Sequence, residues 1–178
     1  VLGVIRPTVE CIGDLTQNRH VGILATSGTI KSESYLLEIE KLFPDVTVTG
    51  EACPMWVPLV ENNEYDSEGA DYFVQKHIRQ LLAKDPDIDT LILGCTHYPL
   101  LIEKIRQFTP SHIRIVPQGE YVAQSLQNYF RRHPEMDNRC TKEGTCRFLT
   151  TESETKFEES ASIFLQQEDI HVERIILE

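Results

Sequence analysis

Short apolar runs alternate along the chain with longer stretches in which apolar residues recur at helical spacing. Runs rich in leucine and β-branched residues predict six strands, at residues 20–26, 46–52, 89–95, 112–117, 145–151 and 172–177. The helical stretches predict helices at residues 7–16, 30–43, 67–83, 99–108, 120–133 and 152–167. This alternation is typical of an α/β fold with mainly parallel sheets and flanking helices.

The end of the third predicted strand carries the most distinctive chemistry. Gly94 closes the strand, Cys95, Thr96 and His97 follow it, and Pro99 suits the first turn of the next helix. Ligands bind at the carboxyl ends of strands in open α/β sheets, and a helix N-terminus favours the thiolate form of a nearby cysteine. We therefore interpret Cys95 and His97 as candidate functional residues. The alternative is a small buried cysteine beside a hydrogen-bonded loop histidine.

Composition narrows the class of protein. The chain has 178 residues, with 28 acidic and 17 basic side chains and a net charge of −11. Nucleic-acid binding needs a basic face, so this charge argues against a nucleic-acid partner. No apolar run approaches the roughly 20 residues of a membrane-spanning helix, which argues against a membrane protein. Five cysteines at irregular spacing suggest no disulfide framework and indicate a reduced, cytoplasmic protein.

A metal site is an alternative interpretation of Cys95 and His97. Structural zinc sites usually contain closely spaced pairs of cysteine or histidine ligands. Cys140 and Cys146 are too far apart in the sequence for such a pair, and no histidine pair accompanies them. We therefore predict that the chain binds no metal.

Four segments of the sequence form an informative combination. They are Ala25-Thr26-Ser27-Gly28-Thr29, then Ala52-Cys53-Pro54 with Val57-Pro58-Leu59-Val60-Glu61, then Gly94-Cys95-Thr96-His97-Tyr98-Pro99-Leu100-Leu101, and the tail from Phe157 to Glu173. In this order they resemble motifs of the cofactor-independent glutamate racemases, in the aspartate/glutamate racemase superfamily. The third segment resembles the motif around that family's second catalytic cysteine.

The resemblance implies two similar α/β domains, the first of which is incomplete here. Residues 1–6 would form the interdomain crossover, residues 7–113 the second domain with Cys95, and residues 114–178 the C-terminal portion of the first domain. The family's other catalytic cysteine lies in an upstream Cys-Asn-Thr segment, which these 178 residues do not contain. We expect a racemase without its N-terminal part, inactive alone, and homo-oligomeric because an incomplete domain exposes apolar faces.

The resemblance also implies roles for individual residues. Cys95 would be one of two acid/base cysteines that move the α-proton of glutamate, with His97 assisting and Glu61 supporting the histidine. The residues implied to bind the substrate are Thr96, His97, Thr29 and Thr26. No cofactor is implied, and the product D-glutamate would supply peptidoglycan. Racemisation of aspartate or hydantoins, and a non-catalytic module that binds a dicarboxylate or a partner, remain alternatives.

Some of the same residues have structural interpretations. Thr29 is predicted to cap the helix that begins at residue 30. Cys53 is interpreted as structural, because the family pattern assigns no catalysis to that position. Cys11, Cys140 and Cys146 have no sequence context that would activate a thiol.

Overall fold

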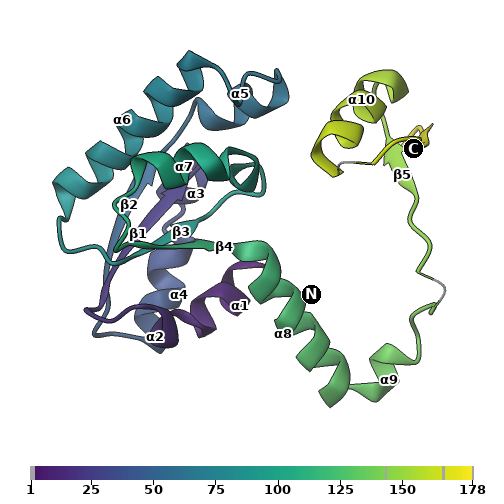
Figure 1. Cartoon of the computed structure of the whole chain (residues 1–178). Coiled ribbons are helices and arrows are strands. Elements are labelled where there is room, and N and C mark those ends of the chain that lie inside the picture. Colours follow the sequence, from purple (N-terminus) through teal and green to yellow (C-terminus); the bar gives the residue numbers. More distant parts are fainter. Residues whose placement is uncertain (1–2, 143, 166, 178) are drawn as a thin grey trace. The chain divides into compact units, whose positions relative to one another are not determined.

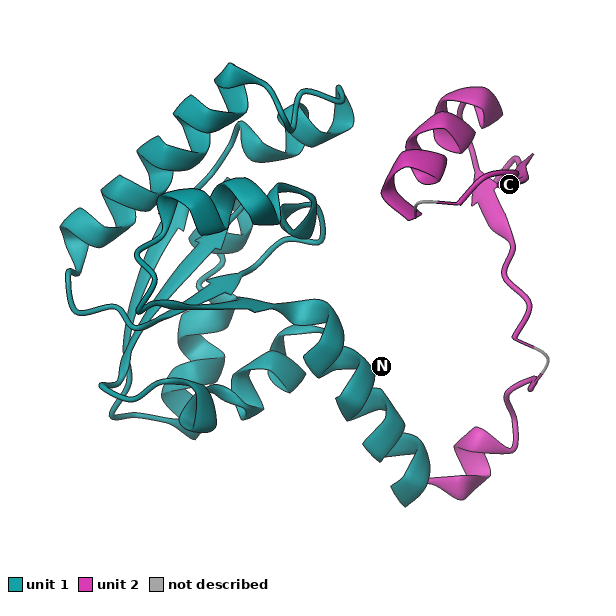
Figure 2. Ribbon diagram, in the orientation of Figure 1, with its two compact units in different colours: residues 1–132 teal, residues 133–178 magenta. Residues whose placement is uncertain are grey.

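The computed structural model describes residues 3–142, 144–165 and 167–177. Val1 and Leu2 of the expected crossover, and Gln166 of the last expected helix, lie outside the described residues. The chain forms two compact units, residues 1–132 and residues 133–178 (Figure 2). These units are defined by the packing within this chain. The boundary expected near residue 113 separates the two domains of a racemase, so the units do not test it, and it stays a prediction.

A four-stranded parallel sheet forms the centre of the first unit (Figure 1). Its strands β1 (His20–Ala25), β2 (Thr47–Ala52), β3 (Thr90–Leu93) and β4 (Arg114–Pro117) lie in the order β2-β1-β3-β4. All four were predicted, with ends that differ by one or two residues. The strand order changes direction between β1 and β3, and ligand sites of open α/β sheets lie at such switch points.

Helices cover both faces of this sheet. One layer contains α1 (Ile5–Glu10), α2 (Ile12–Leu15) and α4 (Ser34–Leu42), and the other contains α6 (Glu68–Lys84) and α7 (Ile102–Phe108) (Figure 1). Side chains alternate along a strand, so Val21 and Ile23 face the first layer, while Leu81 of α6 packs against Gly22 from the other side. Burial on both faces explains why the two inner strands, β1 and β3, are rich in apolar residues.

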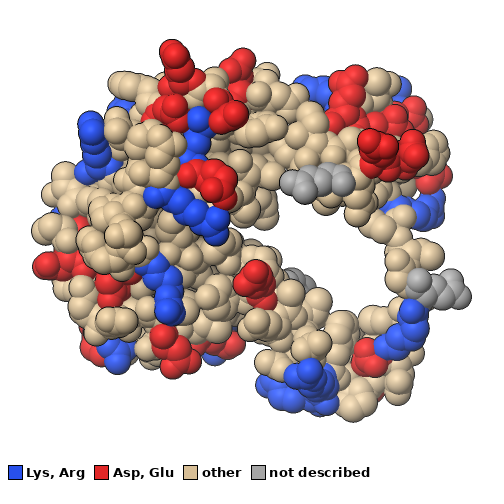
Figure 3. Space-filling view, in the orientation of Figure 1, with Lys and Arg blue, Asp and Glu red and all other residues tan. Residues whose placement is uncertain are grey.

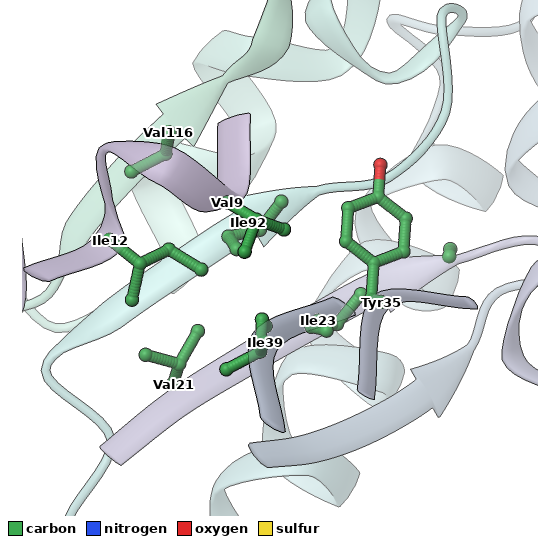
Figure 4. Close-up of a cluster of buried hydrophobic side chains, with 9 residues drawn as sticks. Val9, Ile12, Val21, Ile23, Tyr35, Ile39, Ile92 and Val116 are labelled. Atoms are coloured by element: carbon green, nitrogen blue, oxygen red, sulfur yellow. The ribbon is translucent and has the colours of Figure 1, made fainter. Parts of the chain in front are cut away.

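The core beneath α1, α2 and α4 is made of almost fully buried side chains (Figure 4). Burial of apolar surface contributes roughly 25 cal/mol per Å², so this cluster is a main source of the first unit's stability. It draws on both helices and strands, which fixes the helical layer against the sheet. Its members are Val9, Ile12, Val21, Ile23, Ala25, Tyr35, Ile39, Ile92 and Val116.

Two of the predicted helices are each divided in the structure. The helix expected at residues 30–43 is instead α3 (Ser27–Lys31) followed by α4, because Glu33 adopts a left-handed conformation with φ of 53° that no α-helix continues through. The helix expected at residues 7–16 is α1 and α2, which meet at Cys11. The short helix α5 (Trp56–Glu61) was not predicted at all.

The remaining elements of the first unit follow β3 and β4. The 3₁₀ helix η1 (Tyr98–Leu101) leads directly into α7, so the helix expected at residues 99–108 begins as a tighter turn. The 15-residue helix α8 (Gln118–Arg132) follows β4 and contains no buried residue. Val122 and Leu126 of α8 line a groove with Val4 and Pro7 at the N-terminal end of the chain.

The second unit has a two-stranded parallel sheet of β5 (Phe148–Thr150) and β6 (Val172–Arg174). Helix α10 (Glu154–Leu165) connects them, and the short helix α9 (Pro134–Asp137) precedes them. Both strands were predicted, but they are shorter than the expected runs at residues 145–151 and 172–177. Several apolar side chains of this unit are exposed, with Ile176 at 89% and Leu165 at 47%.

Acidic and basic side chains are interspersed on the face of the first unit shown in Figure 3. Among the described residues, no helix combines the length and the apolar character that crossing a membrane requires.

The core packing leads to a prediction for Ile92, which is 0% exposed in the central strand β3. We expect Ile92→Ala to lower the free energy of unfolding by about 2–5 kcal/mol, since it removes buried methyl groups and leaves a cavity. Urea denaturation followed by circular dichroism measures the change. Leu37→Ala, at a position 49% exposed, serves as the control and is expected to stay within about 0.5 kcal/mol of the unmodified chain. A loss at Ile92 no larger than the loss at Leu37 would contradict the assigned core.

Candidate active site

The carboxyl ends of the four parallel strands meet at one edge of the sheet, and the site lies there. The backbone N–H of Gly94 donates to the carbonyl of Leu24 at 2.8 Å, and that of Cys53 donates to Ala25 at 2.8 Å. These bonds continue the strand pairing past the ends of β3 and β2, so the turns that follow the strands are held beside one another. The residues that begin these turns are Thr26, Cys53, Gly94 and Gln118.

The three predicted catalytic residues are close together. The Sγ of half-buried Cys95 lies 3.9 Å from Nδ1 of His97, and Nε2 of the same imidazole lies 3.3 Å from Oε1 of Glu61. Each ring nitrogen of His97 therefore faces a different partner. The side chain of His97 is 34% exposed and that of Glu61 is 60% exposed. This order places the imidazole between a thiol and a carboxylate, an arrangement that can pass a proton to or from the sulfur.

Packing of two aromatic side chains brings Glu61 and His97 together. Trp56 begins α5, whose last residue is Glu61, and Tyr98 begins η1, directly after His97. The Trp56 and Tyr98 rings meet edge to face with centroids 4.7 Å apart, and both side chains are 0% exposed. An exposed contact such as Glu61–His97 contributes only about 0–1 kcal/mol, whereas the buried aromatic contact holds α5 beside η1.

Sequence reasoning missed these two aromatic residues as parts of the site. The signal that was available is the spacing of Trp56, Leu59 and Val60, which are all buried and recur at helical intervals along α5. Helix α5 has only six residues, too few for that periodicity to be distinguished from a short apolar run.

The threonines of the predicted substrate-binding set lie on two turns. Thr26 and Thr29 follow β1, with their hydroxyl oxygens 3.0 Å apart. Thr26, not Thr29, caps the helix: its Oγ1 accepts from the N–H of Thr29 at 3.3 Å, and the helix begins at Ser27. The prediction of a Thr29 cap was therefore wrong, because the extended backbone ends one turn earlier than expected. Thr96 is exposed on the turn after β3.

Cys53 lies at the same edge but in a different environment. It is 0% exposed, and burial raises the pKa of its thiol far above the usual range, with the Glu51 carboxylate adding to the effect. Burial likewise raises the pKa of Tyr98 well above its usual value, so its neutral hydroxyl donates to the Cys53 carbonyl at 3.2 Å. Cys53 is thus a protonated packing residue, in agreement with its structural interpretation.

The backbone at Gly94 leaves little space for a side chain. A Cβ there would lie 3.0 Å from the Cβ of Ala25, 3.2 Å from the ring of Tyr35 and 3.3 Å from the carbonyl of Leu24. Burial raises the pKa of Tyr35 to about 12, and its hydroxyl accepts a hydrogen bond from the side-chain amide of Gln118. Close packing at Gly94 fixes where the strand ends and therefore where Cys95 begins its turn.

Possible metal ligands gather at the opposite edge of the sheet. The ligand atoms of His20, Asp85 and Asp87 lie within 4.8 Å of one another near the start of β1. The Asp85 carboxylate contacts Nδ1 of His20 at 2.9 Å. It also accepts a hydrogen bond from the hydroxyl of Thr49, which is outside the group, at 3.3 Å. These hydrogen bonds explain why His20 and Asp85 lie close together. That the protein binds no metal stays a prediction.

Comparison with known proteins adds to this geometry. The sequence pattern of the family described as Asp/Glu/Hydantoin racemase matches residues 1–126. The chain belongs to this racemase family. Among curated family members, the glutamate racemase of Streptococcus agalactiae serotype III (strain NEM316) is 38% identical over 180 residues, which cover 99% of this chain and 66% of the relative. The glutamate racemase of Enterococcus faecalis (strain ATCC 700802 / V583) is 39% identical over 182 residues, covering 99% and 64%.

Solved structures of racemases have the same fold. A glutamate racemase isoform of Bacillus anthracis superposes with a TM-score of 0.87 at 30% identity, covering 99% of this chain and 65% of that one. The glutamate racemase of Francisella tularensis, solved in complex with D-glutamate, gives a TM-score of 0.82 at 27% identity, covering 97% and 62%. The expected aspartate/glutamate racemase-like fold is confirmed. The chain spans just under two thirds of the length of these racemases.

The different environments of Cys95 and Cys53 lead to a prediction about thiol reactivity. In the folded chain, iodoacetamide is expected to modify Cys95 and to leave Cys53 unmodified, because Cys53 is buried and its pKa is raised. Peptide mass spectrometry after a timed reaction measures both. The exposed Cys140 and Cys146 act as internal references, and in urea all the cysteines should react. Early modification of Cys53 under native conditions would refute its burial.

Proposed function

We propose that the chain acts in glutamate racemisation, interconverting L- and D-glutamate by two-base proton transfer without a cofactor. The observation that carries this proposal is the sequence of contacts Cys95–His97–Glu61 at the carboxyl edge of the sheet. Membership of the racemase family and similarity to proteins named glutamate racemase support it. D-glutamate supplied in this way would serve peptidoglycan synthesis in the cytoplasm.

Cys95 is the proposed acid/base group on one face of the substrate α-carbon. The α-proton of an amino acid is a weak acid, so its removal needs a positioned base and a carbanion that is held only briefly. The Cys95 thiolate takes the proton as the Cα–H bond breaks, and a thiol on the opposite face returns a different proton to the carbanion. His97, 3.9 Å from the sulfur, assists the proton transfer, and Glu61 orients the imidazole.

The proposed substrate ligands include neutral hydroxyl side chains, which suit a protein of net charge −11. Hydroxyls and backbone N–H groups bind carboxylates without adding net positive charge. Thr26 and Thr29 present paired hydroxyls after β1, and Thr96 is exposed beside Cys95. One hydroxyl of the pair, with His97 and Thr96, would hold the carboxylates of glutamate.

A polypeptide of these 178 residues is expected not to racemise glutamate. They contain Cys95 but no Cys-Asn-Thr segment, so no second thiol delivers a proton to the opposite face. Circular dichroism of D-glutamate with the purified chain should show a constant signal. A steady loss of optical activity that Cys95→Ser abolishes would overturn this expectation.

The racemase function itself is tested by supplying the missing thiol. When the chain is joined to an N-terminal racemase segment containing Cys-Asn-Thr, glutamate should lose optical activity, and Cys95→Ala should abolish turnover with the fold intact. His97→Asn should lower kcat by about 10²- to 10⁴-fold, as expected for loss of an acid–base group. Parallel assays with aspartate and a hydantoin separate the sibling activities. Binding of glutamate without turnover in the joined protein would favour a non-catalytic module.

We also propose that the chain associates with itself. Helix α8 contains no buried residue, and in the second unit Ile163 is 45% and Leu165 47% exposed. Apolar faces of this kind favour contacts between chains. Sedimentation velocity at micromolar concentration is expected to show a dimer or larger species, and a clean monomer would exclude it.

A further inference from the structure

A buried contact between a carboxylate and a histidine takes no part in the proposed proton transfer. Glu51, at the end of β2, is 8% exposed, and His77, in the middle of α6, is 6% exposed. Oε1 of Glu51 contacts Nδ1 of His77 at 2.9 Å, and Oε2 contacts Nζ of Lys84 at 2.7 Å. Burial opposes ionisation of Glu51, but the hydrogen bonds from Lys84 and His77 leave its pKa below the usual range.

Burying such a pair is costly, and apolar residues of similar volume are often as stabilising. Its presence therefore suggests a role in orienting a neighbour. The neighbour is Trp56: the His77 and Trp56 rings lie in an edge-type arrangement, with centroids 6.3 Å apart and an angle of 72° between the ring planes. The indole N–H also donates to the carbonyl of Phe73, one turn before His77, at 3.4 Å. Helix α6 thus holds Trp56 at two points.

Trp56 in turn contacts Tyr98, which follows His97 directly in the chain. The Tyr98 hydroxyl is tied to the Cys53 carbonyl, so the ring has a fixed place at the sheet edge. A displacement of Trp56 would therefore move the start of η1 and with it the turn that carries Cys95 and His97.

We propose that His77, held by Glu51, is a positioning residue for the Cys95 turn and acts through Trp56 and Tyr98. This inference deepens the proposed function and rests on it for the role of Cys95. Its test measures thiol reactivity and fluorescence, not turnover, so its failure and the failure of the racemase proposal are distinguishable.

The main variant is His77→Asn. The asparagine amide can replace the Nδ1 contact to Glu51 but removes the ring that lies against Trp56. We expect the iodoacetamide reaction of Cys95 to slow by about 2- to 30-fold, the range that substitutions along packed networks produce. Trp56 is the only tryptophan of the chain, so its emission reports the same change directly, as a shift to longer wavelength.

The structure offers a matched control in His20→Asn. His20 contacts Asp85 through Nδ1 at 2.9 Å, like the His77 pair, but at the opposite edge of the sheet. It is expected to leave both the Cys95 rate and the Trp56 emission unchanged. Equal effects of the two variants would indicate general loosening and overturn the proposal, as would a His77→Asn chain with unaltered Cys95 rate or emission.

A second variant covers the case in which His77→Asn does not fold, judged by far-ultraviolet circular dichroism. Glu51→Gln keeps an oxygen that accepts from His77 but loses the charge that pairs with Lys84, so it holds the imidazole more weakly. We expect a smaller slowing of the Cys95 reaction, of at least about 2-fold, with an emission change in the same direction. A folded Glu51→Gln chain with an unaltered Cys95 rate would overturn the proposal.

Discussion

Parallel pairing of β1 with β3 is the constraint on which the rest of the site depends. This pairing sets Leu24 of β1 opposite Leu93 of β3. The segments that follow the two strands therefore leave the sheet side by side and in the same direction. One continues into the paired threonine hydroxyls and the other into Cys95. Because the pairing lies at the centre of the sheet and is covered by helices on both faces, neither turn can slide along its strand without unpacking the core.

Three kinds of interaction, which differ in strength, position the site residues. The strand ends are fixed by backbone hydrogen bonds, and α5 and η1 are held together by the aromatic contact of Trp56 with Tyr98. The third interaction is the solvent-exposed contact between His97 and Glu61, which is weak by itself. The proposed proton-transfer residues His97 and Glu61 therefore have the weakest interactions with each other. Their positions depend on buried side chains next to them in the chain.

Much of this arrangement could be predicted from the sequence. The inner strands β1 and β3 were predicted because they are buried on both faces and are rich in apolar residues, whereas β2 and β4 at the sides of the sheet are only partly buried and have shorter apolar runs. Cys95 and His97 were selected by their position after a predicted strand and by family resemblance, Glu61 by family resemblance alone, and the structure brings the three together. Residue patterns failed where a single backbone conformation decides the outcome. The residues around Glu33 do not predict its left-handed backbone conformation. Helix α5 has six residues, which is too short to show a clear helical periodicity of apolar positions. Contacts such as Glu51 with His77 join residues 26 positions apart, which one sequence alone does not reveal.

The close approach at Gly94 has a consequence for how this protein can diverge. Every mutation that changes a glycine codon to that of another amino acid introduces a Cβ, and at this position that carbon would lie unusually close to backbone and core atoms. A larger residue just before Cys95 therefore requires its neighbours to shift, whereas exposed Thr96 just after it can be exchanged without disturbing the core. Sequence change among descendants of this chain is therefore expected first on the solvent side of Cys95, and its sheet side is expected to keep the glycine.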